Sequence, residues 1–232
     1  MIRRNPAAWL PLASMALFGT LALSACSVGG LGASATPTAT PTAAMILQLA
    51  KQVKVTDATV TLTLNGTASG TTFTGTGNGK LTTNPNRTDI TFNLTAAGLQ
   101  IAFETITDAA TNTTYTKYTS PAILASDKWK KSTSGTGSSP VDTSSFTNYG
   151  DLTNVTLVGK DTVNGEAVWH LKGSSSSTST PGSADLYLRQ DNYYPVKFDI
   201  QSTGATSGDI TLVFTAVNSG ITISLPPADQ VQ

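Results

Sequence analysis

The chain has 232 residues, with 14 basic and 14 acidic side chains and a formal net charge of zero. Charged residues make up 12% of the sequence, about half the usual share. The chain therefore lacks the basic surface that nucleic-acid binding requires, while its length suits a single domain with one hydrophobic core.

An apolar N-terminal segment ends at the only cysteine of the chain, Cys26. The parts of a signal peptide precede it in order: Arg3 and Arg4, the mostly apolar residues 7–23, then the small residues Ser24 and Ala25. A transmembrane helix needs about 20 apolar residues, and this run is shorter and contains Pro11. We therefore predict a cleaved signal peptide over residues 1–25 and acyl chains on Cys26, which anchor the protein to the extracytoplasmic face of a cell membrane.

Cleavage would remove two of the 14 basic residues and leave 12 against 14 acidic ones, a net charge of −2. The chain after Cys26 contains no cysteine. Its stability must come from an ordinary hydrophobic core, because no disulfide can form within it.

Residues 26–43 are rich in Ser, Thr, Ala, Pro and Gly and show no apolar periodicity. They are predicted to form a flexible tether, followed by a folded domain over residues 44–232. Thr40 and Pro41 suit the N-cap and first turn of a helix. An amphipathic helix is predicted after them, because four apolar residues recur at helical spacing: Ile46, Leu49, Ala50 and Val53.

From Asp57 onward, apolar and polar residues alternate with the period of half-buried strands. The clearest runs are residues 59–64, 89–96, 99–103, 167–171, 186–188, 196–200 and 210–214. Asn164 and Gly165 form the strongest hairpin signal, because a type I′ turn needs positive φ at both central positions. Short connections predict antiparallel neighbours, and about ten such strands with one apolar face predict a sheet that curls.

The strand predicted at residues 72–82 lacks side chains in the middle of its apolar face. Phe73 and Leu81 flank Gly75, Gly77 and Gly79 on that face. Glycines inside a strand mark a bend or the close approach of another body. A bent strand and a groove for a ligand both remain open.

Two polar stretches interrupt the rhythm of the strands. Residues 132–151 are rich in Ser, Thr and Gly, and a loop of that length in a compact domain is functional or disordered. Residues 174–182 are predicted to form a polar hairpin tip.

Groups suited to catalysis or metal binding are sparse. The only histidine, His170, is placed by alternation on the face opposite Trp169, toward water. A serine nucleophile needs a nearby base, and no Gly-x-Ser-x-Gly motif is present. Asp185, Asp191 and Asp199 do not have the spacing of a calcium loop. We therefore predict no catalytic residue, no metal site and no cofactor, and we expect that the protein is not an enzyme.

Three segments of the C-terminal half resemble the LppX/LprG lipoproteins and their relatives, the LolA/LolB carriers. Residues 158–173 (VGKDTVNGEAVWHLKG) resemble a Gly-bounded hairpin of that family. Two further segments follow in the same order. They are the strand ADLYLR with YPVK, within residues 184–197, and ITLVF with ITISLP, within residues 210–226. The likeness in layout covers residues 57–227.

This resemblance implies a mainly β (α+β) fold, in which a strongly curved antiparallel sheet forms an open half-barrel. The N-terminal helix and short helices would lie on its concave face, with a hydrophobic cavity between. Residues 132–151 depart from the family, because they are too rich in Ser, Thr and Gly to form good helices. The apolar residues predicted to line the cavity are Phe73, Leu81, Ile90, Phe92, Leu94, Ile101, Phe103, Trp169 and Leu171.

Two functions stay open. The first is a monomeric, membrane-anchored envelope lipoprotein that binds an acylated lipid or glycolipid and carries or presents it; each buried methylene would contribute about 0.8 kcal/mol. The second is a non-catalytic scaffold, with a core filled by the helix, that contacts another envelope protein. Alternation assigns residues to a face but does not show whether the space above that face is empty.

Overall fold

The computed structural model describes residues 40–133, 152–175, 182–203 and 206–232. Cys26, the signal peptide, nearly all of the tether and most of the two polar stretches lie outside the described residues. Residues Thr40–Gln232 form one compact unit, and both hydrophobic clusters described below lie inside it. Within the described part of the chain, no helix is long and apolar enough to cross a membrane.

One α-helix precedes the strands, and a short 3-10 helix, η2 (Ala228–Gln230), lies near the C-terminus. The elements in chain order are α1 (Ala43–Gln52), β1 (Asp57–Ala68), β2 (Thr71–Thr83), β3 (Asn86–Ala96), β4 (Leu99–Asp108), β5 (Thr113–Ser120), β6 (Lys130–Thr133), β7 (Leu152–Val163), β8 (Glu166–Ser175), β9 (Gly182–Arg189), β10 (Pro195–Ser202) and β11 (Thr206–Thr215).

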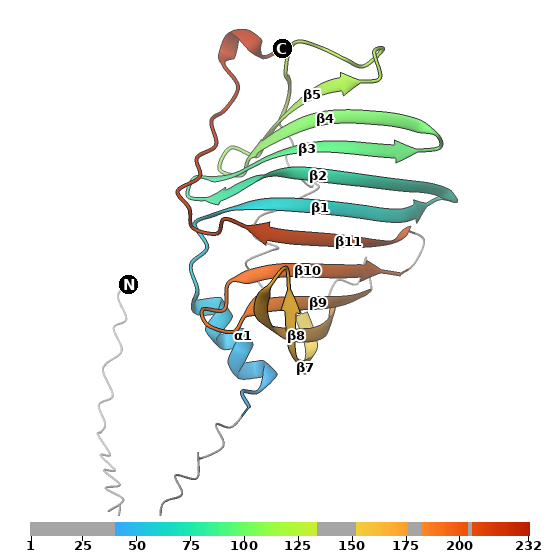
Figure 1. Ribbon diagram of the computed structural model, residues 1–232. Coiled ribbons are helices and arrows are strands. Elements are labelled where there is room, and N and C mark those ends of the chain that lie inside the picture. The colour runs from blue at the N-terminus through green and yellow to red at the C-terminus, as the bar shows by residue number, and fades with distance from the viewer. Residues whose placement is uncertain (1–39, 134–151, 176–181, 204–205) are drawn as a thin grey trace, which may run out of the picture. The chain divides into compact units, whose positions relative to one another are not determined.

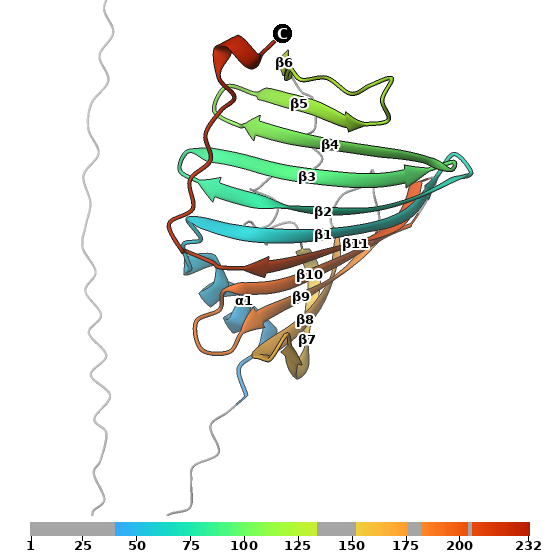
Figure 2. The ribbon, with the colours of Figure 1, turned by 45° about the horizontal axis from the view of Figure 1, so that its top comes forward.

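The strands form a single antiparallel sheet in the order β6-β5-β4-β3-β2-β1-β11-β10-β9-β8-β7 (Figure 1). Two meanders, β1–β6 and β7–β11, meet where β1 pairs with β11 from Thr59 opposite Thr215 to Ala68 opposite Thr206. The sheet curves and does not close, because β6 and β7 are its two edges (Figure 2). The mainly β, open and curved antiparallel sheet expected from the sequence is confirmed.

Tight turns connect the hairpins as their residues predict. Asn164 and Gly165 have φ of 51° and 84°, the positive pair that a type I′ turn requires. Ala97 and Gly98, between β3 and β4, have φ of 50° and 79°. Such turns match the twist of the flanking strands and so fix the pairing register.

Helix α1 packs its apolar side on the apolar face of the sheet. Ile46 and Ala50 are buried in a cluster with side chains of β8, β9, β10, β11 and β1. The helix begins two residues later than predicted, because Thr42 and not Thr40 caps it: the Met45 N–H donates to Thr42 Oγ1 at 3.3 Å. Of the four apolar residues predicted at helical spacing, Ile46 and Ala50 are buried and Val53 packs against the same cluster, whereas Leu47 joins that cluster in place of Leu49.

A second, smaller cluster forms on the opposite face of the sheet, where alternation directs Ile106 of β4 and Tyr115 of β5. The C-terminal segment covers them with Ile223, Leu225 and Val231, next to the buried Trp129. Backbone hydrogen bonds join Trp129 to Gln230 and Gln232 and make a parallel bridge opposite Val231. This segment also contains η2, the second of the two helices in the described residues.

Asp57 fixes the start of that C-terminal segment. Its buried carboxylate accepts hydrogen bonds from the Ser219 N–H at 2.8 Å, the Gly220 N–H at 3.3 Å and the Thr56 hydroxyl at 2.9 Å. Burial alone would raise the pKa of Asp57, but these bonds and one from the Ile221 backbone outweigh it and hold the pKa below the ordinary carboxyl value.

Replacing Asp57 by Asn is expected to lower the free energy of unfolding by about 2 kcal/mol at neutral pH, because buried donors lose a charged acceptor. The depressed pKa means that this stabilisation is complete above the unfolded-state pKa and is lost as the pH falls through the folded-state value. The difference between wild type and Asp57→Asn should therefore shrink from pH 6 to pH 2.5 in urea unfolding. Asp209→Asn, at an exposed position, is the control, with a change of about 0.5 kcal/mol or less; a pH-independent difference for Asp57→Asn would contradict this account.

Candidate functional site

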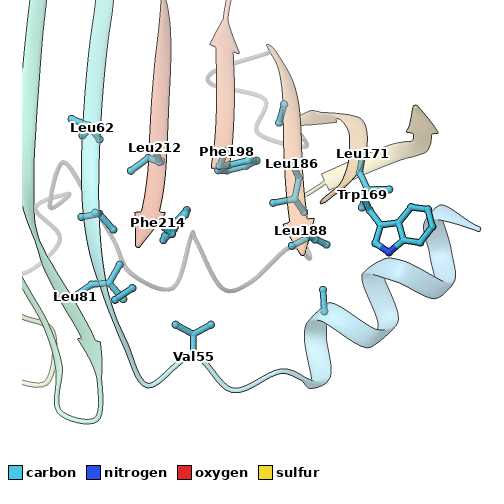
Figure 3. Close-up of a cluster of buried hydrophobic side chains, with 14 of the residues drawn as sticks. Val55, Leu62, Leu81, Trp169, Leu171, Leu186, Leu188, Phe198, Leu212 and Phe214 are labelled. Atoms are coloured by element: carbon cyan, nitrogen blue, oxygen red, sulfur yellow. The ribbon is translucent and has the colours of Figure 1, made fainter. Parts of the chain in front are cut away.

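One face of the sheet carries no charge across most of its width. In β1–β5 and β8–β11, register and alternation direct every charged side chain to the opposite face. A cross-strand row illustrates the uncharged face: Leu171, Leu186, Phe198, Leu212, Leu62, Gly77, Phe92, Phe103 and Tyr118 (Figure 3 shows its first five members). A continuous apolar surface therefore crosses both meanders.

The nine predicted lining residues all lie on this face, but they divide by burial. Five are at most 7% exposed and belong to the main hydrophobic cluster: Leu81, Ile90, Phe92, Trp169 and Leu171. Four are half-buried: Phe73, Leu94, Ile101 and Phe103. The sheet thus brings the nine onto one surface without giving them one environment.

The most buried region lies beside α1. Ile46 and Ala50 of the helix share the cluster with Trp169 and Leu171, and Val55 of the following connection lies between the helix and Leu81 (Figure 3). The indole Nε1 of Trp169 is buried without a hydrogen-bond partner among the described residues. This region is closed by the protein's own side chains.

Burial decreases toward the ends of the strands that meet at the β1–β2 and β3–β4 turns. Leu64 lies opposite Ile210 of β11 and, across Gly75, near Leu94 of β3. We call the half-buried side chains at this end the distal patch: Leu64, Phe73, Leu94, Ile101, Ile200 and Ile210. Three of its six members, Phe73, Leu94 and Ile101, were among the nine predicted residues. No sequence signal distinguished Leu64, Ile200 and Ile210 from core residues.

An aromatic row borders the distal patch. The rings of Phe92 and Phe103 stack with centroids 5.1 Å apart, and Tyr118 follows at 5.6 Å from Phe103. Offset aromatic pairs of this spacing stabilise a surface beyond the area they bury. On β3–β5 the row therefore lies between the buried residues and the patch.

Side chains and backbone of β3 pack directly over the glycines of β2. A Cβ on Gly75 would collide with Leu94 Cδ2, and one on Gly77 would lie 3.2 Å from the Phe92 ring. A Cβ on Gly79 would collide with the Asp89 carbonyl oxygen and lie 2.7 Å from Ile90 Cα. Of the two interpretations of these glycines, the described contacts fit close packing of neighbouring strands in a curved sheet.

A shallow hollow of about 380 Å³ lies at the same ends of the strands. Its lining is polar: Asn65, Gly66, Thr67, Thr72, Ser202, Ser207, Gly208 and Asp209. Alternation directs Asn65, Thr67, Thr72, Ser207 and Asp209 to the charged face, opposite the distal patch, so the sheet separates this hollow from the patch.

The opposite face of β8–β11 carries a polar network. His170 faces away from Trp169, as predicted, but it is not free in water: its Nε2 lies 2.7 Å from Asp185 Oδ1 and its ring stacks on Tyr187 at 4.4 Å. Burial raises the pKa of the Tyr187 phenol; nearby carboxylates, including Asp185, add to the rise, while Lys197 opposes it. No hydroxyl or thiol nucleophile hydrogen-bonds to His170 among the described contacts.

On the same face of β3–β5, burial raises the pKa of Glu104, and the neighbouring Asp89 carboxylate raises it further against the charge of Lys117. Within the described residues no group of three His, Cys, Asp or Glu side chains has the arrangement of a metal site.

No sequence-family model matches the chain, and no curated protein matches it in sequence. Solved structures do resemble it. The lipoprotein LppX of Mycobacterium tuberculosis aligns at 16% identity with a TM-score of 0.49, over 77% of this chain and 93% of that one. An uncharacterized conserved protein of Thermus thermophilus aligns at 12% identity and a TM-score of 0.39, over 81% and 96% of the two chains.

A putative outer membrane lipoprotein-sorting protein domain of Vibrio parahaemolyticus aligns at 11% identity and a TM-score of 0.32, over 76% of this chain and 92% of that one. A lipoprotein LppX and a lipoprotein-sorting domain, the kinds of protein that the sequence resembles, are thus among the structures to which this chain is similar. These similarities concern the fold and not the ligand.

Gly79→Ala is expected to lower the free energy of unfolding by about 3 kcal/mol, because the new methyl group collides with backbone atoms of β3 that cannot turn aside. Gly77→Ala is the matched control on the same strand and face, where the methyl group meets only side-chain atoms; it should cost about 1 kcal/mol. Urea midpoints of the two variants and wild type measure the difference. Equal losses would show that crowding against β3 does not set the glycine requirement.

Proposed function

We propose that the protein is a membrane-anchored envelope lipoprotein that binds an acylated lipid or glycolipid on the distal patch and carries or presents it. It acts by burial of the ligand and catalyses no reaction. The observation that carries the proposal is the uncharged face of the sheet, whose large apolar side chains remain partly exposed at one end.

The distal patch has the chemistry of an acyl-chain surface. Leu64, Leu94 and Ile101 are half-buried branched side chains, and no charged residue of the described neighbouring strands points between them. An acyl segment of about eight methylenes would gain about 6 kcal/mol by burial there, before the cost of immobilising it. That gain suits a protein that must take up a lipid and release it again.

The five fully buried members of the predicted set have a different role in this proposal. Trp169 and Leu171 hold α1 in place, while Leu81, Ile90 and Phe92 form the floor that supports the patch. They position the ligand-binding surface and need not touch the ligand.

The anchor completes the proposal. Acyl chains on Cys26 would keep the domain at the extracytoplasmic face of a membrane, because two or more chains give lasting attachment while one gives only marginal attachment. Residues 27–39 would act as the tether between that anchor and the domain, which begins near Thr40.

A non-catalytic scaffold is the second candidate, favoured by the closed core beside α1. In that case the apolar face serves stability alone, and an envelope protein contacts the surface of the domain. The scaffold predicts that no lipid accompanies the purified protein and that acyl probes do not bind.

The chain from residue 27 to 232 contains the whole described core and lacks Cys26, so its lipid content reports on ligand and not on anchor. We expect mass spectrometry of organic extracts of this purified protein to detect an acylated lipid in a defined molar ratio. We also expect a fluorescent fatty acyl probe to bind and to be displaced by that lipid. If no lipid co-purifies and the probe does not bind, the proposal is overturned in favour of the scaffold.

Leu94→Asp should weaken binding of the acyl probe at least tenfold, because it places a charge within the distal patch. Thr95→Asp is the matched control, since the exposed Thr95 lies next along β3 and faces the other side of the sheet. Circular dichroism of both variants checks the fold, and Phe73→Ser provides a second, uncharged change in the patch. Equal probe affinity in Leu94→Asp and Thr95→Asp would place the ligand elsewhere.

A further inference from the structure

The loop between β5 and β6 exposes two neighbouring apolar side chains. Ile123 is 90% exposed and Leu124 46% exposed, whereas the side chains of the main core are almost fully buried. They lie in the run Pro121-Ala122-Ile123-Leu124-Ala125, which contains no charged residue. Single exposed apolar residues are common, but adjacent ones at a protruding loop indicate a contact surface.

The loop holds these side chains outward in a defined turn. The Leu124 and Ala125 N–H groups donate to the Pro121 carbonyl at 2.9 and 3.1 Å, and the Ser126 N–H donates to the Tyr118 carbonyl at 3.0 Å. With these backbone groups satisfied internally, the loop can enter an apolar environment without leaving them unpaired.

Basic side chains follow the apolar run directly. Lys128, Lys130 and Lys131 are exposed, and none of the three forms a salt bridge with a described residue. Asp127 is the single carboxylate of residues 117–131, against four lysines with Lys117 included. Lys117 lies opposite Glu104 of β4, whose charge balances it. Against Lys128, Lys130 and Lys131 stand Asp127 and, on the adjoining C-terminal segment, Asp229, so the loop keeps an excess of one positive charge.

The lysines stand behind the apolar tip at the depth of lipid headgroups. Lys130 pairs with Thr116, four residues before β5 ends at Ser120, which is roughly 13 Å along the strand. Lys128 is nearer to the tip by two residues. With Ile123 and Leu124 among acyl chains, the long lysine side chains reach the anionic headgroup layer, where each contributes to attraction.

We propose that the β5–β6 loop is a membrane-docking element, in which Ile123 and Leu124 insert into a bilayer and Lys128, Lys130 and Lys131 contact anionic headgroups. A bilayer is the occupant that fits an apolar tip with a basic collar. Residues 27–39 separate Cys26 from Thr40, and an extended chain of that length spans about 45 Å. The anchored domain can therefore turn this loop toward the same membrane, at a high effective concentration. This inference does not depend on a lipid bound to the distal patch.

Vesicle flotation of the chain from residue 27 to 232 tests the docking. Wild type should float with vesicles of phosphatidylcholine and phosphatidylglycerol in a ratio of about 7:3, and binding should weaken as salt is raised. The double variant Ile123→Ser with Leu124→Ser should bind at least tenfold less. Lys128→Glu with Lys130→Glu should lose at least tenfold with anionic vesicles and change little with pure phosphatidylcholine.

Val158→Ser is the matched control, because Val158 is 57% exposed on the edge strand β7; it should bind vesicles as wild type does. A residue-27–232 chain has no cysteine, so Leu124→Cys and Val158→Cys can each carry one environment-sensitive dye. The dye at position 124 should shift to the blue when anionic vesicles are added, and the dye at 158 should not. Absence of wild-type flotation, equal flotation of the serine double variant, or equal dye shifts would each overturn the docking proposal.

Discussion

The antiparallel pairing of β1 with β11 is the constraint on which the other features of this protein depend. These two strands come from opposite ends of the domain, yet they lie side by side at the middle of the sheet and join two meanders. Their register sets Leu62 opposite Leu212 and Leu64 opposite Ile210. A shift of one residue would turn one meander's apolar side chains to the charged face, so the continuous apolar surface exists only in this register.

Helix α1 breaks the symmetry of that surface. It is short, and together with Val55 it covers one region of the apolar face, where Trp169 and Leu171 are closed off. The C-terminal segment packs on the other face, held by Asp57 and by the Trp129 bridge. The described covering elements therefore leave the distal end of the apolar face less buried, and the proposed binding surface lies apart from the region that stabilises the fold.

Sequence alone could predict what depends on local pattern. Period-two alternation assigned Leu94, Ile101 and Trp169 to one face because side chains of a strand alternate strictly. It did not single out β5, whose residues 113–120 alternate threonine with lysine and tyrosine and carry little apolar signal. It also could not find the pair of His170 with Asp185, because a cross-strand contact needs the register of β8 with β9. The division of the nine apolar residues by burial was equally out of reach, since it depends on where α1 lies.

The two proposed surfaces lie at the same end of the sheet. The distal patch lies near the β3–β4 turn. The β5–β6 loop begins after Ser120, which pairs with Ala102 near the start of β4, at the same end of the sheet (Figure 1). A bilayer that received Ile123 would therefore lie next to the least buried part of the apolar face. An acyl chain that passed from the bilayer to the distal patch would then cross little water. The free-energy cost of its transfer would be lower, because exposing methylenes to water is what slows lipid transfer. Docking and lipid binding, although independently testable, would then act on the same route.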